Sequence, residues 1–203
     1  MKLSILGSAL ALCLLILSFS VNADDSIQDM NTQVTFPKEI SFDYNGKTYN
    51  LDATGVATRK KLFFKVYSIA HYLQKDAKPT NGTNVQKIMS DANAKIVIMK
   101  WVRDVDNKKM TETILETFHN VLSPEKFAQI EPEITSYIKI FDRSVSKGNE
   151  FTLRWIPGGH IQVIYNGNNV GEVTNKEFAT ALWSFWFGDK SVVDKNDLMS
   201  LMK

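Results

Sequence analysis

The fold is decided by residues 55–73, which read GVATRKKLFFKVYSIAHYL. The part from Leu62 to Leu73 is apolar on both alternations of a strand, apart from Lys65, and this predicts a central strand that is covered on each face. Residues 55–61 predict a link that leads into this strand. The basic triplet Arg59–Lys61 stands at the end of that link, so the sequence places positive charge where a buried strand begins.

Turn motifs elsewhere predict that neighbouring strands pair. Asn45-Gly46 lies between two alternating apolar runs, and both residues tolerate the positive φ of a two-residue hairpin turn. Pro157-Gly158-Gly159 and Asn166-Gly167 divide the alternating pattern of residues 151–173 in the same way. Residues 95–102 predict one more strand. Together these strands predict a mainly antiparallel sheet.

Helical spacing predicts a layer of helices inserted among the strands. Apolar residues recur at helical spacing in residues 110–121 and again in 130–141. Thr174 and Glu177 form a capping-box pattern that opens a last long helix, which Gly188 ends. Strands, inserted helices, further strands and a closing helix indicate an α+β protein.

The N-terminal residues 1–23 predict a secretory signal peptide. Lys2 supplies the positive start, Leu3–Leu17 is almost wholly apolar, and Val21-Asn22-Ala23 is a small-residue cleavage site. We expect cleavage after Ala23 and a periplasmic or secreted protein with no stable membrane anchor. An uncleaved anchor is the alternative, for which the stretch is short against the roughly 20 residues of a spanning helix.

The rest of the chain predicts one domain. Residues 24–33 are polar and are expected to be disordered, and residues 34–203 hold the regular pattern. A chain of 203 residues with 44% hydrophobic residues is able to bury one core. The only cysteine, Cys13, lies in the predicted leader, so disulfides, thiolate chemistry and sulfur-ligated metals are excluded for the remainder.

Charge and motifs exclude several classes of function. With 24 Lys and Arg against 22 Asp and Glu, the net charge of +2 lacks the concentrated basic face of a nucleic-acid binder. His71, His119 and His160 do not have the short spacing of metal ligands, and no phosphate loop, dinucleotide motif or Gly-x-Ser-x-Gly motif occurs. We therefore expect no metal, no cofactor and no nucleic-acid partner.

Arg59 is the candidate for a ligand site. At the mouth of an apolar cleft, a guanidinium binds a carboxylate through two parallel hydrogen bonds, or it holds a phenolate, and it keeps its charge. A solvated charge at the start of a strand is the alternative, and this is the expected role of Lys60 and Lys61.

Residues 55–73 resemble the signature of the chalcone isomerase-like proteins, in particular their exported bacterial branch. The remaining motifs of that family follow in the same order: Arg103-Asp104, residues 145–148, Pro157-Gly158-Gly159, Asn166-Gly167 and residues 178–190. The resemblance covers most of residues 35–202. It implies an open-faced β-sandwich, in which a large antiparallel sheet carries a layer of helices with an apolar cleft between them.

The resemblance also implies roles for residues on one strand. Arg59 looks like the arginine that meets the charged oxygen of the substrate in the plant enzymes, which add a phenolate oxygen across a conjugated ketone. Tyr67 stands where those enzymes have a threonine. Both residues are candidate ligand-binding and catalytic residues.

Five further ligand-binding candidates follow from the same resemblance. Met110, Thr113 and Thr117 stand where the plant enzymes have tyrosine, lysine and asparagine on the helix that lines the cleft. Ser184 or its neighbour Phe185 stands where a threonine or serine is expected. Met110 removes a hydrogen-bond donor from the cleft, and Tyr67 is able to supply a hydroxyl from the opposite wall.

Three functions follow as hypotheses. The first is a binding protein for a small amphipathic or aromatic acid, either a fatty or a phenolic acid, because non-catalytic relatives bind fatty acids. The second is an intramolecular lyase, that is an isomerase, acting on a chalcone-like conjugated ketone. The third is a non-catalytic module that meets a protein partner, whose identity the sequence leaves open.

Overall fold

The computed structural model describes residues 25–77, 82–141 and 143–202. Seven strands form one antiparallel sheet in which each strand pairs with the next along the chain. They are β3 (Glu39–Tyr44), β4 (Lys47–Lys61), β5 (Phe64–Gln74), β6 (Lys95–Trp101), β7 (Glu150–Ile156), β8 (His160–Tyr165) and β9 (Asn168–Thr174). The large antiparallel sheet predicted from the sequence is confirmed. The predicted leader, residues 1–23, lies outside the described residues.

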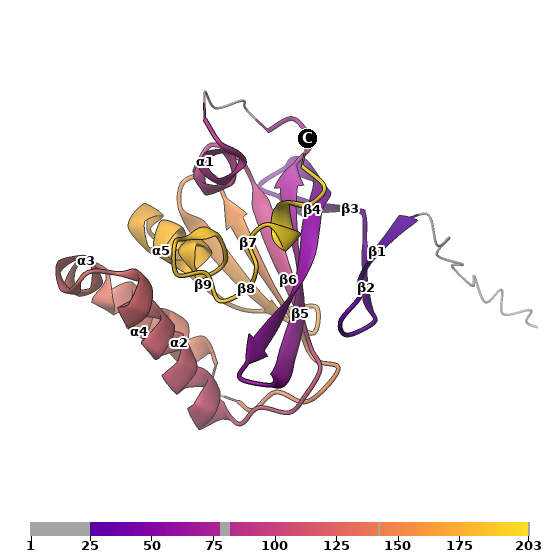
Figure 1. The fold of residues 1–203 in the computed structure, drawn as a ribbon. Helices are drawn as coiled ribbons and strands as arrows, with labels where there is room; N and C mark the ends of the chain where they lie inside the picture. The colour runs from indigo at the N-terminus through magenta and orange to yellow at the C-terminus, as the bar shows by residue number, and fades with distance from the viewer. Residues whose placement is uncertain (1–24, 78–81, 142, 203) are drawn as a thin grey trace, which may run out of the picture.

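Helices cover one face of the sheet, and a two-stranded ribbon lies on its other side (Figure 1). The helices are α1 (Asn84–Met89), α2 (Asn107–Val121), α3 (Pro124–Gln129), α4 (Glu131–Ile140), α5 (Lys176–Phe187) and the 3₁₀ helix η2 (Asp197–Met199). The ribbon pairs β1 (Ser26–Asp29) with β2 (Val34–Pro37). None of the helices in the described ranges is long and apolar enough to cross a membrane. The α+β class is confirmed.

The segment that carries α2, α3 and α4 leaves the sheet and returns to it at one point. It begins after β6 and ends before β7, and these two strands pair directly with each other. The backbone N–H of Trp101 donates to the carbonyl of Asn149 at 2.9 Å, and the N–H of Gly148 donates to the carbonyl of Trp101 at 2.8 Å. Residues 102–149 therefore form an excursion whose two ends are hydrogen-bonded to each other.

The disorder expected for residues 24–33 is wrong for the part that the structure describes. Strand β1 is held by Asp29, whose Oδ2 accepts from the hydroxyls of Thr58 at 2.6 Å and Ser68 at 2.7 Å. Burial acts to raise the pKa of Asp29, but these hydrogen bonds bring the pKa below its ordinary value. A polar segment is therefore ordered here because one buried carboxylate ties it to the sheet.

The link expected at residues 55–61 is also wrong, because β4 continues through Lys61. The chain then reverses over Leu62 and Phe63, and β5 begins at Phe64 rather than at Leu62. Three large apolar residues occupy this turn and its exit, whereas turns are ordinarily marked by Gly, Asn or Pro. Nothing in the apolar pattern therefore revealed the turn.

The cap of α5 differs from the predicted capping box by one residue. Asn175, not Thr174, caps the helix, since its side chain accepts from the N–H of Phe178 at 3.0 Å. The hydroxyl of Thr174 instead lies 2.7 Å from Nδ1 of His160 on the neighbouring strand. The helix ends at Gly188 as predicted.

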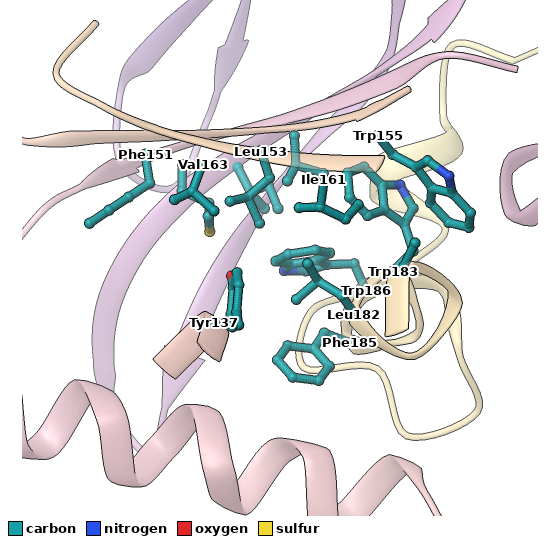
Figure 2. Packing of buried hydrophobic residues seen from close by; sticks show 14 of the residues in the cluster. Tyr137, Phe151, Leu153, Trp155, Ile161, Val163, Leu182, Trp183, Phe185 and Trp186 are labelled. Atoms are coloured by element: carbon teal, nitrogen blue, oxygen red, sulfur yellow. The ribbon is translucent and has the colours of Figure 1, made fainter. Parts of the chain in front are cut away.

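The core between sheet and helices is rich in aromatic residues. Figure 2 shows side chains of α5 directed at the inner face of β7 and β8, and the rings of Trp155 and Trp183 meet edge to face at 5.3 Å. Lys95 is fully buried beside them, with Nζ 3.5 Å from the ring centre of Trp155 and 2.7 Å from the carbonyl of Ser90. Burial lowers the pKa of Lys95 to about 7, and the nearby carboxylate of Asp91 partly offsets this.

Candidate functional site

A cavity of about 500 Å³ lies between the sheet and the helices. Its inner wall is made of buried apolar and aromatic side chains: Met99, Met110, Phe141, Phe151, Phe185 and Trp186. Its rim carries the exposed residues Leu62, Phe64, Arg103, Asp104, Asp106 and Lys109. The site therefore has an apolar interior and a rim where charged groups gather.

Six of the seven residues predicted for the site line this cavity, namely Arg59, Tyr67, Met110, Thr113, Thr117 and Phe185. They come from β4, β5, α2 and α5, so residues far apart in the sequence meet in one place. Ser184 does not line the cavity. Its hydroxyl donates to the carbonyl of Ala181 at 2.6 Å, one turn back along α5, so of the two neighbours it is Phe185 that faces the cavity.

The guanidinium of Arg59 is half-buried and is anchored through backbone oxygens. Its Nη1 donates to the carbonyl of Val192 at 2.8 Å and to that of Lys60 at 3.2 Å. Within the ranges that the structure describes, no carboxylate forms an ion pair with Arg59, and its Nε and Nη2 make no hydrogen bond. One edge of the guanidinium therefore has donors without a partner among the described residues, and Arg59 lines the cavity.

Tyr67 lies on the opposite side of the cavity from α2 and is buried. Its hydroxyl oxygen accepts from Nε1 of Trp186 at 3.2 Å. Burial raises the pKa of Tyr67 above its ordinary value of 10, against the opposing effects of the Trp186 hydrogen bond and the positive charge of Arg59. The phenol is therefore protonated at neutral pH and is a hydrogen-bond donor.

Two polar groups of the inner wall were not predicted as site residues from the sequence. Tyr137 of α4 is only 3% exposed, and its hydroxyl has no hydrogen-bond partner among the described residues; Figure 2 shows this oxygen directed toward the sheet. Burial raises the pKa of Tyr137, and the nearby Tyr67 raises it further. Trp101 of β6 also lines the cavity, and its buried Nε1 has no partner in the described structure. Both are donors, and both lie among apolar walls.

Of the two threonines of α2 that line the cavity, Thr117 contributes less polarity than its position implies. The hydroxyl of Thr117 donates to the carbonyl of Thr113 at 2.7 Å, inside the helix. Buried Met110 presents a thioether where the plant enzymes of the resemblance have a phenol. The α2 wall is therefore apolar at Met110 and Thr117, and the buried donors of the inner wall come from β5, β6 and α4, beside the half-buried Arg59 of β4.

The acidic residues of the rim are engaged by backbone groups. Asp106 caps α2 by accepting from the N–H of Lys109 at 2.9 Å, and Asp104 accepts from the N–H of Lys147 at 2.7 Å. Among the described residues, no group of three His, Cys, Asp or Glu is placed to hold a metal ion. The arrangement fits an elongated molecule that has an apolar body and one anionic or acceptor end.

Comparison with known proteins identifies the fold. The model of the chalcone isomerase-like family matches residues 29–199. The structure is similar to a crystal structure of a fatty-acid binding protein of Arabidopsis thaliana, with a TM-score of 0.69 and 17% sequence identity, over 87% of this chain and 95% of that chain. At this identity the likeness shows the fold alone, and it confirms the architecture that the order of motifs implied. No curated protein matches the chain.

Proposed function

Because the chain belongs to the family of chalcone isomerase-like proteins, we propose that it binds a small amphipathic acid, a fatty or phenolic acid, in this cavity. The observation that carries the proposal is a cavity of about 500 Å³ with apolar walls and, at one side, an arginine that has no carboxylate partner in the described structure. This volume lies in the range of roughly 300–1,000 Å³ that is usual for small-molecule sites. The fatty-acid binding protein that shares the fold supports the choice of ligand.

Arg59 is proposed to bind the carboxylate of the acid. The hydrogen bond from Nη1 to the Val192 carbonyl fixes the guanidinium before any ligand arrives, so little ordering is left for binding. The free edge of the guanidinium has the geometry for two parallel hydrogen bonds to a carboxylate. A partly buried setting strengthens such a pair relative to one in water.

The remaining donors are proposed to select among acids. Tyr67, Tyr137 and Trp101 each present a donor that no described residue accepts, in a wall that is otherwise apolar. Of the three, Nε1 of Trp101 is a fully buried atom without a partner among the described residues, and such a donor costs the protein roughly 1–3 kcal/mol. A second oxygen on the ligand, such as a phenolic hydroxyl or a ketone, would recover this energy.

Acid binding is tested by displacement of a fluorescent fatty acid, anthroyloxy-stearate, from the purified full chain. We expect palmitate to displace the probe, and methyl palmitate to displace it at least about tenfold less well, because the ester carries no charge for the arginine. Equal competition by acid and ester would contradict the anion site. A chain that binds neither compound would favour the role of a protein-interaction module instead.

Export to the periplasm, in the bacterial branch of the family, is a further part of the proposal. It is supported by the leader-like residues 1–23. The intact mass of the chain recovered after expression reports whether it begins at Asp24. The same sample, extracted and analysed by mass spectrometry, identifies any acid that the protein retained.

An intramolecular lyase acting on a conjugated ketone is the second candidate. The observation that favours it is a pair of protonated phenols, Tyr67 and Tyr137, near Arg59, since donors of this kind stabilise the charge that grows on an enolate oxygen. If the site catalyses this reaction, the visible absorbance of 2′-hydroxychalcone falls faster with the chain than without it. An unchanged rate, with the compound shown to bind, would exclude this candidate.

A further inference from the structure

The tip of the β4–β5 hairpin exposes three consecutive large apolar side chains. Leu62 is 84% exposed, Phe63 is 96% exposed and Phe64 is 58% exposed. Figure 1 shows this tip at the lower end of the molecule, away from the C-terminus. Single exposed apolar residues are common, but a contiguous group on a protruding turn indicates a contact surface.

The backbone conformation at the tip is strained for the residue that occupies it. Leu62 has a φ of +55°, a left-handed conformation that glycine and asparagine adopt with the least strain. The two other two-residue turns of the described sheet, Asn45-Gly46 and Asn166-Gly167, have the residues that such turns favour. Strain retained at an exposed site, where no packing compensates it, points to a function of the side chains themselves.

Cations surround the apolar tip. Lys60 and Lys65 flank it in the two strands and are exposed, and the guanidinium of Arg103 lies 4.7 Å from the ring centre of Phe64. None of these three forms an ion pair with a described carboxylate, whereas Lys61 pairs loosely with Glu116 at 3.6 Å. An apolar wedge with a collar of positive charge is complementary to an anionic bilayer, where the wedge enters the acyl region and the cations meet phosphate groups.

The tip also forms part of the cavity rim. Lys61, Leu62 and Phe64 line the cavity together with Arg59. Any flat surface that the tip enters therefore lies against the rim of the cavity. For an acid with a long apolar body, this arrangement shortens the path through water between the bilayer and the binding site.

We propose that the β4–β5 tip docks the protein onto an anionic lipid bilayer, with the cavity rim against the membrane surface. The docking itself does not require a ligand, and only the passage of an acid between bilayer and cavity rests on the proposed function. A second copy of the chain and a protein partner are the other possible occupants of the tip, and the test separates them from a membrane.

The test places a fluorescent reporter at the tip of the full chain by the substitution Phe63→Trp. The four native tryptophans, Trp101, Trp155, Trp183 and Trp186, are at most 8% exposed, so an indole at the tip is the one that responds to a change of solvent. With vesicles of equal parts phosphatidylglycerol and phosphatidylcholine, we expect its emission to shift to shorter wavelength and to be quenched by brominated lipid. The matched control is Leu201→Trp, near the C-terminus, which we expect to show neither effect.

A second variant, Leu62→Gly with Phe63→Ser, separates docking from folding. It supplies glycine where φ is positive and removes apolar area, so we expect unchanged or higher thermal stability together with at least about tenfold weaker partitioning into the vesicles in a sedimentation assay. Residues 1–24 are the same in all variants, so their contribution cancels. Partitioning equal to wild type would overturn the proposal, as would equal affinity for vesicles of phosphatidylcholine alone. A shift of emission with protein concentration in the absence of lipid would also overturn it, in favour of a second copy.

These outcomes are independent of the proposed function. Failure of docking with normal palmitate displacement would leave the acid site intact. Normal docking, together with no displacement of the probe by any acid, would support the membrane contact and contradict the proposed acid site.

Discussion

The substitution Arg59→Met is expected to weaken the binding of palmitate by about 10- to 150-fold, since hydrogen bonds to a charged group contribute roughly 1.5–3 kcal/mol and about 1.4 kcal/mol corresponds to a factor of ten. Methionine keeps the apolar stem of the side chain and removes the charge. The dissociation constant is measured by displacement of the fluorescent acid. The affinity for methyl palmitate is expected to stay the same, because the ester has no anion for the guanidinium to bind.

The control for this substitution is Lys61→Met, which removes a second cation of the same rim. Lys61 already faces Glu116 at 3.6 Å and is more exposed to solvent screening, so we expect less than about a threefold change in acid affinity. Both variants should unfold at urea concentrations near that of wild type, since neither side chain is part of the core. An unchanged affinity of Arg59→Met for palmitate would contradict the proposed role of this arginine in binding the acid.

The substitution Asp91→Ala is expected to lower the free energy of unfolding by about 3–4 kcal/mol, because each buried donor left without an acceptor costs roughly 1–3 kcal/mol. Oδ1 of Asp91 accepts from Nε1 of fully buried Trp155 at 2.8 Å and from the N–H of Gly159 at 2.8 Å. It also accepts from the N–H of Gly158 at 3.0 Å. The substitution thus removes the acceptor for the β7–β8 turn and for one of the two fully buried tryptophan rings, Trp155.

The loss of unfolding free energy in Asp91→Ala should depend on pH, because the carboxylate of Asp91 stabilises the positive charge of buried Lys95. The pKa of Lys95 is about 7 in the folded protein, below its ordinary value of 10.5, and Asp91 acts to raise it. The unfolded chain therefore binds the proton more tightly, and wild-type stability rises with pH between about 7 and 10. Without Asp91 the folded pKa falls further, so the destabilisation should be larger at pH 6 than at pH 8 in urea unfolding.

Two further variants test this account of Asp91. In a Lys95→Met background, Asp91→Ala should destabilise the protein equally at pH 6 and pH 8, since no buried amine is left whose charge the carboxylate supports. Asp189→Ala removes an exposed carboxylate and should change the unfolding free energy by less than about 0.5 kcal/mol. A destabilisation by Asp91→Ala of less than about 1 kcal/mol would mean that water replaces the carboxylate at the turn.

The sheet was predictable because its turns are local. Asn45-Gly46 and Asn166-Gly167 fix where one strand ends and the next begins, and strands joined by such turns pair with each other. The turn at Leu62-Phe63 was not predicted because its residues are large and apolar, unlike those of ordinary turns. Strand β1 was not predicted because its order depends on hydrogen bonds from Thr58 and Ser68 to Asp29, and these residues are distant from it in the sequence.

The candidate site was predictable where the order of family motifs reached it. Arg59 and Tyr67 belong to the quoted stretch, and Met110 and Phe185 belong to helices that the motif order places on the cleft. Tyr137 lies on a helical stripe that predicts burial, but spacing along one helix does not reveal which wall its hydroxyl faces. Which of Ser184 and Phe185 faces the cavity likewise depends on how α5 is oriented about its own axis, and the sequence does not give this orientation.

The excursion between β6 and β7 has a consequence for how this protein could diversify. The strands on either side of residues 102–149 pair with each other directly, so the sheet is complete without that segment. Residues 102–149, which supply one wall of the cavity, are thus an insertion between two paired strands of the sheet. Arg59 lies on strand β4, in the sheet itself. Under the proposed function, exchanging residues 102–149 between relatives should change the preference for the apolar body of the ligand and leave the proposed contact of Arg59 with its charged end unchanged.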